Sequence, residues 1–223
     1  MYSFTGVLGL RARSDEAKRR RRQEILATAD QLLRANGLDK FTMNKLATAC
    51  GLAKGTLYLY FATREELMLN LYINLNEAWI ERFLAVERRS NSADYEGICI
   101  RFYKSFTVDE LLVEFAALAA CTLEPHVPQI AWIAAKKSQG KIAKRLGGMF
   151  CQKLKCQPAA AQRLAWAFIA GLSGAQQRAI DVGGRADLPA DLLQLSGFMS
   201  SRDVFLNLVL PLAPFLRKQD TTP

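Results

Sequence analysis

The chain has 223 residues, of which half are apolar and 23% are charged, as is typical of a folded protein with a sizeable core. No apolar run approaches the roughly 18 residues of a membrane-spanning helix, so we expect no contact with a membrane. The net charge of +9 is concentrated in residues 1–64, which hold twelve Lys or Arg against five Asp or Glu, and this asymmetry favours an anionic partner such as nucleic acid.

Motifs for catalysis and metal binding are missing from the sequence. The five cysteines form no C-x-x-C pair, and the single His126 has no zinc-ligand partner at a familiar spacing. The string Gly171 to Ala175 is one residue short of a nucleophile elbow. We therefore expect no enzyme, no cofactor and no metal, and the unpaired thiols indicate a reducing cytoplasm.

The first 17 residues are predicted to form a disordered basic tail. A helix is expected to follow, with Ile25, Ala29 and Leu33 on one apolar stripe and a C-cap at Gly37. Its start is a basic run: Lys18, Arg19, Arg20, Arg21 and Arg22. Beside a DNA-binding motif, such a run can neutralise phosphates or lie in a minor groove. A solvated helix start is the alternative.

The next stretch has the pattern of a helix-turn-helix. Thr42 can cap a short first helix, and Gly51 can supply the positive φ of the turn. A second helix is expected from Lys54 to Phe61, with Leu57 and Phe61 directed inward because they are spaced i, i+4. A further long helix begins after the capping box of Thr63 and Glu66 and runs on from Leu67.

The outer face of the second helix offers hydrogen-bond donors and no carboxylate. Its polar side chains are Lys54, Thr56, Tyr58 and Tyr60. This chemistry suits the major groove of DNA. Three crossing helices of an ordinary core are the alternative interpretation.

Two strings in this region carry a resemblance to a known family. They are Ala29-x-x-Leu32-Leu33-x-x-x-Gly37-Leu38 and Thr42-Met43-x-x-Leu46-Ala47-x-x-x-Gly51-Leu52-Ala53-x-Gly55-Thr56-Leu57-Tyr58-x-Tyr60-Phe61-x-x-Arg64-Glu65-x-Leu67. In order and spacing they resemble the N-terminal domain of the tetracycline-repressor (TetR) family, over about a fifth of the chain. Ala53 departs from the family pattern, which usually has a Ser cap there, and Arg64 stands where Lys is more frequent.

The resemblance implies which residues contact DNA. Base and phosphate contacts are expected from Asn44, Lys54, Thr56, Tyr58 and Tyr60. Contacts that hold the DNA backbone are expected from Thr42, Arg64, Arg19, Arg20, Arg21 and Arg22.

The remainder of the chain reads as helices. They are expected at about 67–90, 97–106, 108–122, 129–156, 158–182 and 203–216. The basic side chains of the 129–156 helix are most simply a solvated face. In the TetR family the last two helices usually form the dimer, which implies interface residues Ala167, Gly171, Gly174, Ala175, Phe205 and Leu208. A monomer core is the alternative.

A pocket for a small molecule is the remaining expectation. Its candidate lining is Phe102, Tyr103, Phe106, Phe115, His126, Trp132, Trp166 and Phe168. Aromatic residues at helical spacing can equally be plain core. No motif indicates what the pocket would bind.

Together with the resemblance, the sequence predicts an all-α cytoplasmic protein. A three-helix DNA-binding domain is expected at residues 18–66, and a helical effector-binding and dimerisation domain at residues 67–223. The predicted function is a homodimeric repressor that binds double-stranded operator DNA and is released by a small apolar or amphipathic ligand. The alternative is a DNA-binding regulator without small-molecule input, whose C-terminal domain serves dimerisation or a protein partner.

Overall fold

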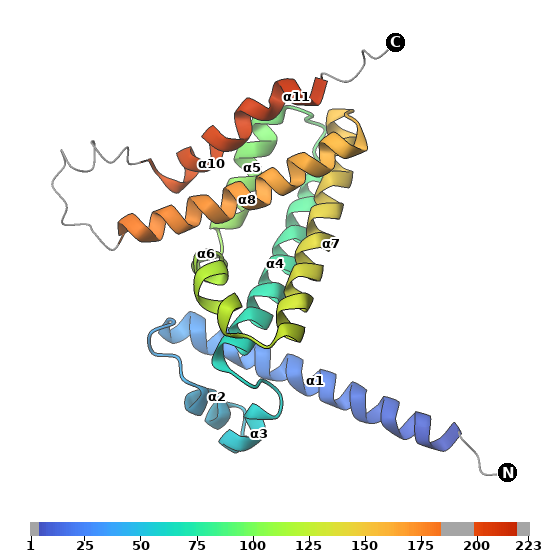
Figure 1. The fold of residues 1–223 in the computed structure, drawn as a ribbon, viewed down its shortest axis with the longest axis vertical. Helices are drawn as coiled ribbons and strands as arrows, with labels where there is room; N and C mark the ends of the chain where they lie inside the picture. The colour runs from blue at the N-terminus through green and yellow to red at the C-terminus, as the bar shows by residue number, and fades with distance from the viewer. Residues whose placement is uncertain (1–4, 184–198, 218–223) are drawn as a thin grey trace. The chain divides into compact units, whose positions relative to one another are not determined.

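The computed structural model describes residues 5–183 and 199–217, and the chain divides into two compact units at residues 71 and 72. The first unit holds three helices and the start of a fourth (Figure 1). They are α1 (Thr5–Asn36), α2 (Met43–Ala49), α3 (Lys54–Tyr58) and the first turns of α4 (Arg64–Arg89). No strand occurs among the described residues, as the all-α prediction requires.

The first helix is longer than expected. It begins at Thr5, inside the segment 1–17 that was predicted to be a disordered tail. Pairs spaced three or four residues apart support this helix along its exposed face. Arg19 contacts Glu16 at 2.6 Å, and Arg20 contacts Glu24 at 3.2 Å. The helix therefore does not repel itself at its basic run, since carboxylates one turn away offset the charge.

The core of the first unit comes from the apolar stripes of all four helices. Its most deeply buried members are Ile25, Ala29, Leu33, Leu46, Leu57, Phe61 and Leu67. Leu57 and Phe61, which were predicted to point inward, are both among these buried residues. Their packing directs the remaining side chains of α3 outward.

The second unit consists of the rest of α4 and a set of shorter and longer helices. They are α5 (Tyr95–Thr107), α6 (Glu110–Leu118), the π-helical turn η1 (Ala119–Leu123), the 3₁₀ turn η2 (Glu124–His126), α7 (Gln129–Leu154), α8 (Pro158–Gly183), α10 (Ser201–Val209), the 3₁₀ turn η3 (Leu210–Leu212) and α11 (Ala213–Arg217). Figure 1 shows α4 and α7 side by side and α10 along α8.

Side-chain caps define several of these helices. Asp94 caps α5, Asp109 caps α6 and Ser200 caps α10, each by accepting a backbone N–H. The helix expected at 108–122 instead changes to π-helical geometry at Ala119. The 3₁₀ turn η2 accommodates Pro125 in its first turn, and the helical run ends at Val127, which is extended because it precedes Pro128.

Candidate functional site: a DNA-binding surface

The turn of the helix-turn-helix is built as its sequence predicts. The Thr42 side chain accepts a hydrogen bond from the Lys45 backbone N–H at 3.2 Å and so caps α2. Gly51 has φ of +63°, a left-handed conformation that favours glycine. Ala53, at the N-cap of α3, gives that helix no side-chain hydrogen bond, so its first backbone N–H groups stay open to a ligand.

The outer face of α3 is polar at its start and apolar at its end. Lys54 is exposed, Thr56 is half-buried, and Tyr58 is 39% exposed. The helix ends at Tyr58 rather than at Phe61, and Tyr60 lies half-buried in the turn that follows. Tyr60 is therefore presented by a turn, not by the helix.

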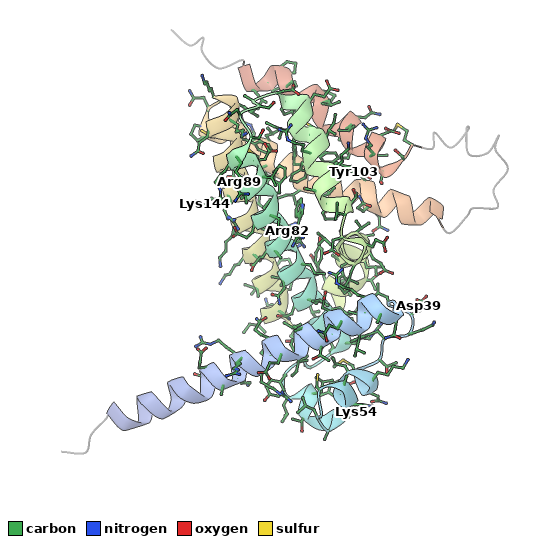
Figure 2. The ribbon with its side chains drawn as sticks, turned by 180° about the vertical axis from the view of Figure 1, so that it is seen from behind. Asp39, Lys54, Arg82, Arg89, Tyr103 and Lys144 are labelled. Carbon is green, nitrogen blue, oxygen red and sulfur yellow. The ribbon has the colours of Figure 1, made fainter. Side chains whose placement is uncertain are left out.

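A hollow beside α3 brings together residues from three helices and the loop before α2. Its lining is Asp39, Phe41, Thr42, Met43, Asn44, Lys54, Tyr58 and Arg64. Five of the side chains predicted to contact DNA thus share one concave surface. Figure 2 labels Lys54 on α3 and Asp39 on the loop of the same unit. Asp39 is the single carboxylate of the lining, against the two cations Lys54 and Arg64.

Arg64 divides its contacts between the fold and the hollow. Its Nη2 donates to the Leu38 carbonyl at 3.1 Å, and its guanidinium lies 6.0 Å from the centre of the Phe41 ring. The Nε–H is buried and has no partner among the described residues. Arg64 therefore fixes the start of α4 to the loop after α1 while it lines the hollow.

The basic run of α1 also splits into two kinds of side chain. Arg19 and Arg20 are exposed and reach only carboxylates of their own helix. Arg21 donates to the Cys50 carbonyl at 3.0 Å, inside the turn of the motif, and to Glu24 at 2.9 Å. The hydrogen bond between Arg21 and Glu24 lowers the pKa of the Glu24 carboxyl and raises the pKa of the Arg21 guanidinium.

Arg22 is directed into the unit. Its guanidinium lies 4.1 Å from the centre of the Phe61 ring, donates to the Tyr60 carbonyl and lies 3.6 Å from a Glu66 oxygen. Glu66 in turn accepts the Ala62 backbone N–H at 2.8 Å. These contacts tie α1 to the turn between α3 and α4, so Arg22 has a structural role that its place in a basic run did not reveal.

Leu59 was not among the predicted contacts. It directly follows α3 and is 76% exposed. Apolar side chains on a groove-facing surface can contact the methyl group of thymine. The exposure depends on how α3 ends, which the spacing of the sequence did not show.

Comparison with known proteins identifies this unit. Residues 25–71 match the family model described as bacterial regulatory proteins of the tetR family. The first unit therefore carries a DNA-binding domain of the tetR type.

The curated relatives that match this region carry the names of regulators. The fatty acid metabolism regulator protein of Bacillus subtilis is 32% identical over 65 residues, which is 29% of this chain and 34% of that protein. An uncharacterized HTH-type transcriptional regulator of Haemophilus influenzae is 38% identical over 53 residues, 24% of this chain and 28% of that protein. The match spans about a third of the length of these relatives.

Solved tetR-family structures share the fold over most of the chain. A TetR transcriptional regulator from Rhodococcus sp. RHA1 has a TM-score of 0.57 at 14% identity, covering 91% of this chain and 99% of that one. FadR of Thermus thermophilus, a TetR-family transcriptional repressor in complex with lauroyl-CoA, has a TM-score of 0.56 at 15% identity, covering 91% and 97%. The helical second unit is thus part of the same fold.

Most of the aromatic residues predicted to line a pocket are buried in the second unit. Phe102, Phe106, Phe115, Phe168 and Tyr103 are all buried. The Phe102 ring centre lies 5.0 Å from those of Trp79 and Phe168, in edge-to-face contact. Their packing against one another makes these aromatic residues core.

The other three predicted pocket residues lie on the surface. Trp132 is 42% exposed and Trp166 is 43% exposed. The exposed His126 shares a hydrogen bond of 2.9 Å between its Nδ1 and the Thr122 carbonyl, inside its own turn. The predicted set is therefore not brought together at one place.

The predicted interface residues are also divided. Phe205 and Ala175 are fully buried within the chain, and Gly171 packs against α10, where an added Cβ would lie 3.6 Å from the Phe205 ring. Leu208 is 53% exposed, and Gly174 faces open space. The small residues of α8 lie on more than one of its faces. Their spacing in the sequence therefore did not show which face of α8 packs against α10.

Neither a membrane-spanning helix nor a cluster of metal ligands occurs in residues 5–183 and 199–217. None of the helices there has the length and apolar character to cross a membrane. No group of three or more His, Cys, Asp or Glu side chains suited to a metal ion occurs in the same residues.

Proposed function

We propose that the protein is a sequence-specific DNA-binding transcriptional repressor that acts as a homodimer and responds to a small ligand. The observation that carries the proposal is the hollow of the first unit, where Thr42, Asn44, Lys54, Tyr58 and Arg64 converge beside the open N-terminus of α3. Tyr58 and Leu59 face the bases, while the cations of the hollow receive a backbone phosphate.

The distribution of the arginines refines which residues touch DNA. Arg19 and Arg20 keep exposed guanidinium groups that can exchange their helix carboxylates for phosphates. Arg21 and Arg22 hold the motif together through the Cys50 and Tyr60 carbonyls. We expect the second pair to affect DNA binding by orienting α3.

Lys54 provides the direct test, with Lys40 as the matched control. Both side chains are exposed in the same unit, but only Lys54 lines the hollow. Lys54→Ala should weaken operator binding and reduce the salt slope by about 1, because one phosphate contact is lost, whereas Lys40→Ala should change neither. Equal effects of the two substitutions on affinity and slope would contradict this assignment.

The homodimer is supported by apolar side chains left at the surface of the last helices. Trp166 of α8, Leu208 of α10 and Phe215 of α11 are 43%, 53% and 66% exposed. An apolar groove lies beside them, lined by Ala160, Arg163, Leu164, Ala167, Leu212, Phe215 and Leu216. A second copy covers this face in our proposal, since two recognition helices one DNA turn apart bind a palindrome far better than one.

For the ligand, the structure favours a region that the sequence did not indicate. Gln176 of α8 is buried, and its Nε2 has no hydrogen-bond partner among the described residues. The π-helical turn η1 lies close by, since Cys121 Sγ is 3.8 Å from Oε1 of Gln177. An unpaired buried amide costs about 1–3 kcal/mol, and a polar group of an effector would offset that cost.

An effector screen by thermal shift tests this part of the proposal. The relatives' names make fatty acyl thioesters such as lauroyl-CoA the first compounds to try. A ligand at a hundred times its Kd adds about 2.7 kcal/mol to stability. Gln176→Leu should raise the unfolding temperature of the free protein, because it removes the unpaired amide, and should lose the shift on adding ligand. An undiminished shift would place the ligand elsewhere.

A regulator without small-molecule input is the second candidate. The observation that favours it is the mutual packing of Phe102, Phe168 and Phe205, which fills the space assigned to a ligand by sequence. Operator release that no screened compound produces would support it.

A further inference from the structure

Helix α7 carries cations without a single carboxylate. Its 26 residues include six Lys or Arg and no Asp or Glu. A solvated helix face normally alternates both signs, because pairs three or four residues apart stabilise it. The basic character of α7 therefore calls for anions from outside the helix.

Three of the six cations find such anions inside the unit. Lys136 contacts Glu124 at 2.7 Å, Arg145 contacts Glu81 at 2.7 Å, and Lys153 lies 3.5 Å from Glu87. The other three have no ion pair within the described part of the chain, and all are exposed: Lys137, Lys141 and Lys144. Their i, i+4, i+7 spacing places them on one stripe.

Helix α4 extends this stripe into a surface. Contacts of α7 residues 138, 145 and 153 with α4 residues 77, 81 and 87 show that the two helices run parallel. Figure 2 shows them side by side, with Arg82, Arg89 and Lys144 labelled along them. Arg82 and Arg89 are exposed and spaced i, i+7.

Carboxylates do not neutralise this surface. Glu77 accepts a hydrogen bond from Ser138 at 2.6 Å, Glu81 pairs with Arg145, and Glu87 is fully buried against Arg101. We define the α4–α7 basic face as Arg82, Arg89, Lys137, Lys141 and Lys144. Each member is free of ion pairs among the described residues, so the face presents five uncompensated charges.

We infer that the α4–α7 basic face is a second, sequence-independent surface for the phosphate backbone of double-stranded DNA, separate from the helix-turn-helix. Seven residues of helix span about 10.5 Å, so Lys137 and Lys144 can contact separate phosphates of one duplex. The face has no aromatic side chain to stack unpaired bases, which disfavours single strands. Within the basic stretches, 82–89 of α4 and 137–144 of α7, Val86 is the one exposed large apolar residue, which is too little for lipid insertion. The exposed Ile130, Trp132 and Ile133 of α7 lie before Lys137.

The test uses the full-length chain and a long random duplex without operator. Lys141→Gln with Lys144→Gln removes two charges from the face. Lys104→Gln with Arg202→Gln removes two exposed charges from α5 and α10, which lie together because Tyr103 bonds Ser201 at 2.6 Å. The binding constant is measured against salt for the wild type and both pairs.

If the basic face binds DNA, the substitutions at Lys141 and Lys144 should lower the salt slope by about 1–2. The substitutions at Lys104 and Arg202 should leave the slope unchanged. Equal slopes for the two pairs would overturn the inference. Weaker binding to poly-glutamate with unchanged DNA binding would also overturn it, because the face would then serve an acidic protein.

Failure of this inference is distinguishable from failure of the proposed function. Tyr58→Ala should remove operator preference while it keeps the random-duplex salt slope of the wild type. A variant that loses only its operator preference tests the role of α3. The salt slope of the Lys141→Gln, Lys144→Gln variant on the random duplex tests the basic face.

Discussion

Tyr58 shows how one side chain connects the packing of a helix to the reading of DNA. Leu57 is fully buried beside it, so the direction of Tyr58 is set by the core of the first unit. Tyr58→Ala should therefore abolish preference for the operator without changing the unfolding temperature, because 39% of the side chain is exposed. Competition binding and thermal melting measure the two effects, and a stable variant that still selects its operator would refute the role.

Cysteine reactivity checks the core of the second unit residue by residue. Burial raises the pKa of the Cys99 thiol to about 12, so its thiolate is scarce at pH 8 and appears only as the pH approaches that value. Cys121 is exposed. Iodoacetamide should modify Cys121 in the native protein well before Cys99, as followed by mass spectrometry. Equal rates would show that the core opens.

Residues with local partners were predictable, and residues with distant ones were not. Thr42 and Gly51 act on backbone within three residues, so their roles follow from the string itself. Arg22 contacts Tyr60, 38 residues away, and no local pattern separates it from Arg20. Arg21 and Arg22, two of the five residues of the basic run, thus bond the motif, which the sequence did not show, and their contact with DNA stays a prediction.

At the level of elements, Glu87 joins three helices. Its carboxylate accepts hydrogen bonds from Arg101 at 2.7 and 3.2 Å and lies 3.5 Å from Lys153, so it fastens α4 to α5 and α7. Removing one partner of a buried pair leaves charges uncompensated. We expect Glu87→Ala to cost about 3 kcal/mol, the low end of the range for buried pairs, since Arg101 is partly exposed.

Glu81 is the matched control on the same helix. It pairs with Arg145 at 2.7 Å but is 60% exposed, so Glu81→Ala should cost less than about 1 kcal/mol. Denaturant unfolding of both variants gives the comparison. Similar losses would mean that the Glu87 network does not hold the helices together.

Helix existence was easier to predict than helix ends and faces. Apolar spacing located every long helix, whereas the π-helical turn at Ala119 and the early end of α3 depend on tertiary packing. The same limit applies to α8: Gly171 faces α10 inside the chain, Ala175 is fully buried, and Trp166 is 43% exposed. The interface and pocket residues were therefore only partly placed by sequence.

For the whole molecule, the exposed face of α8 should decide the oligomeric state. Trp166→Glu should weaken self-association by about thirtyfold or more, as loss of a tryptophan contact worth about 2 kcal/mol implies. Trp132→Glu is the control, because that side chain is equally exposed at 42% but lies on α7. Sedimentation velocity over a concentration series compares them, and a Trp166→Glu variant that remains dimeric would exclude this face.

Two units with different tasks make up the whole. The first carries a tetR-type domain, whose hollow we propose for the DNA backbone. The second has an apolar face that we propose for a copy of the chain and a basic face that we propose for further phosphates. Each surface is tested by a substitution that leaves the others intact. Their functions can therefore be separated in the full-length protein.

Binding to the intergenic DNA that flanks the protein's own gene tests the central claim most directly. A mobility shift at several salt concentrations, with random DNA as competitor, measures specificity apart from charge. Sequence-specific regulation predicts a complex that survives excess random competitor and is lost in Tyr58→Ala. A wild-type complex that random DNA displaces as readily as the flanking DNA does would contradict sequence-specific binding at this site.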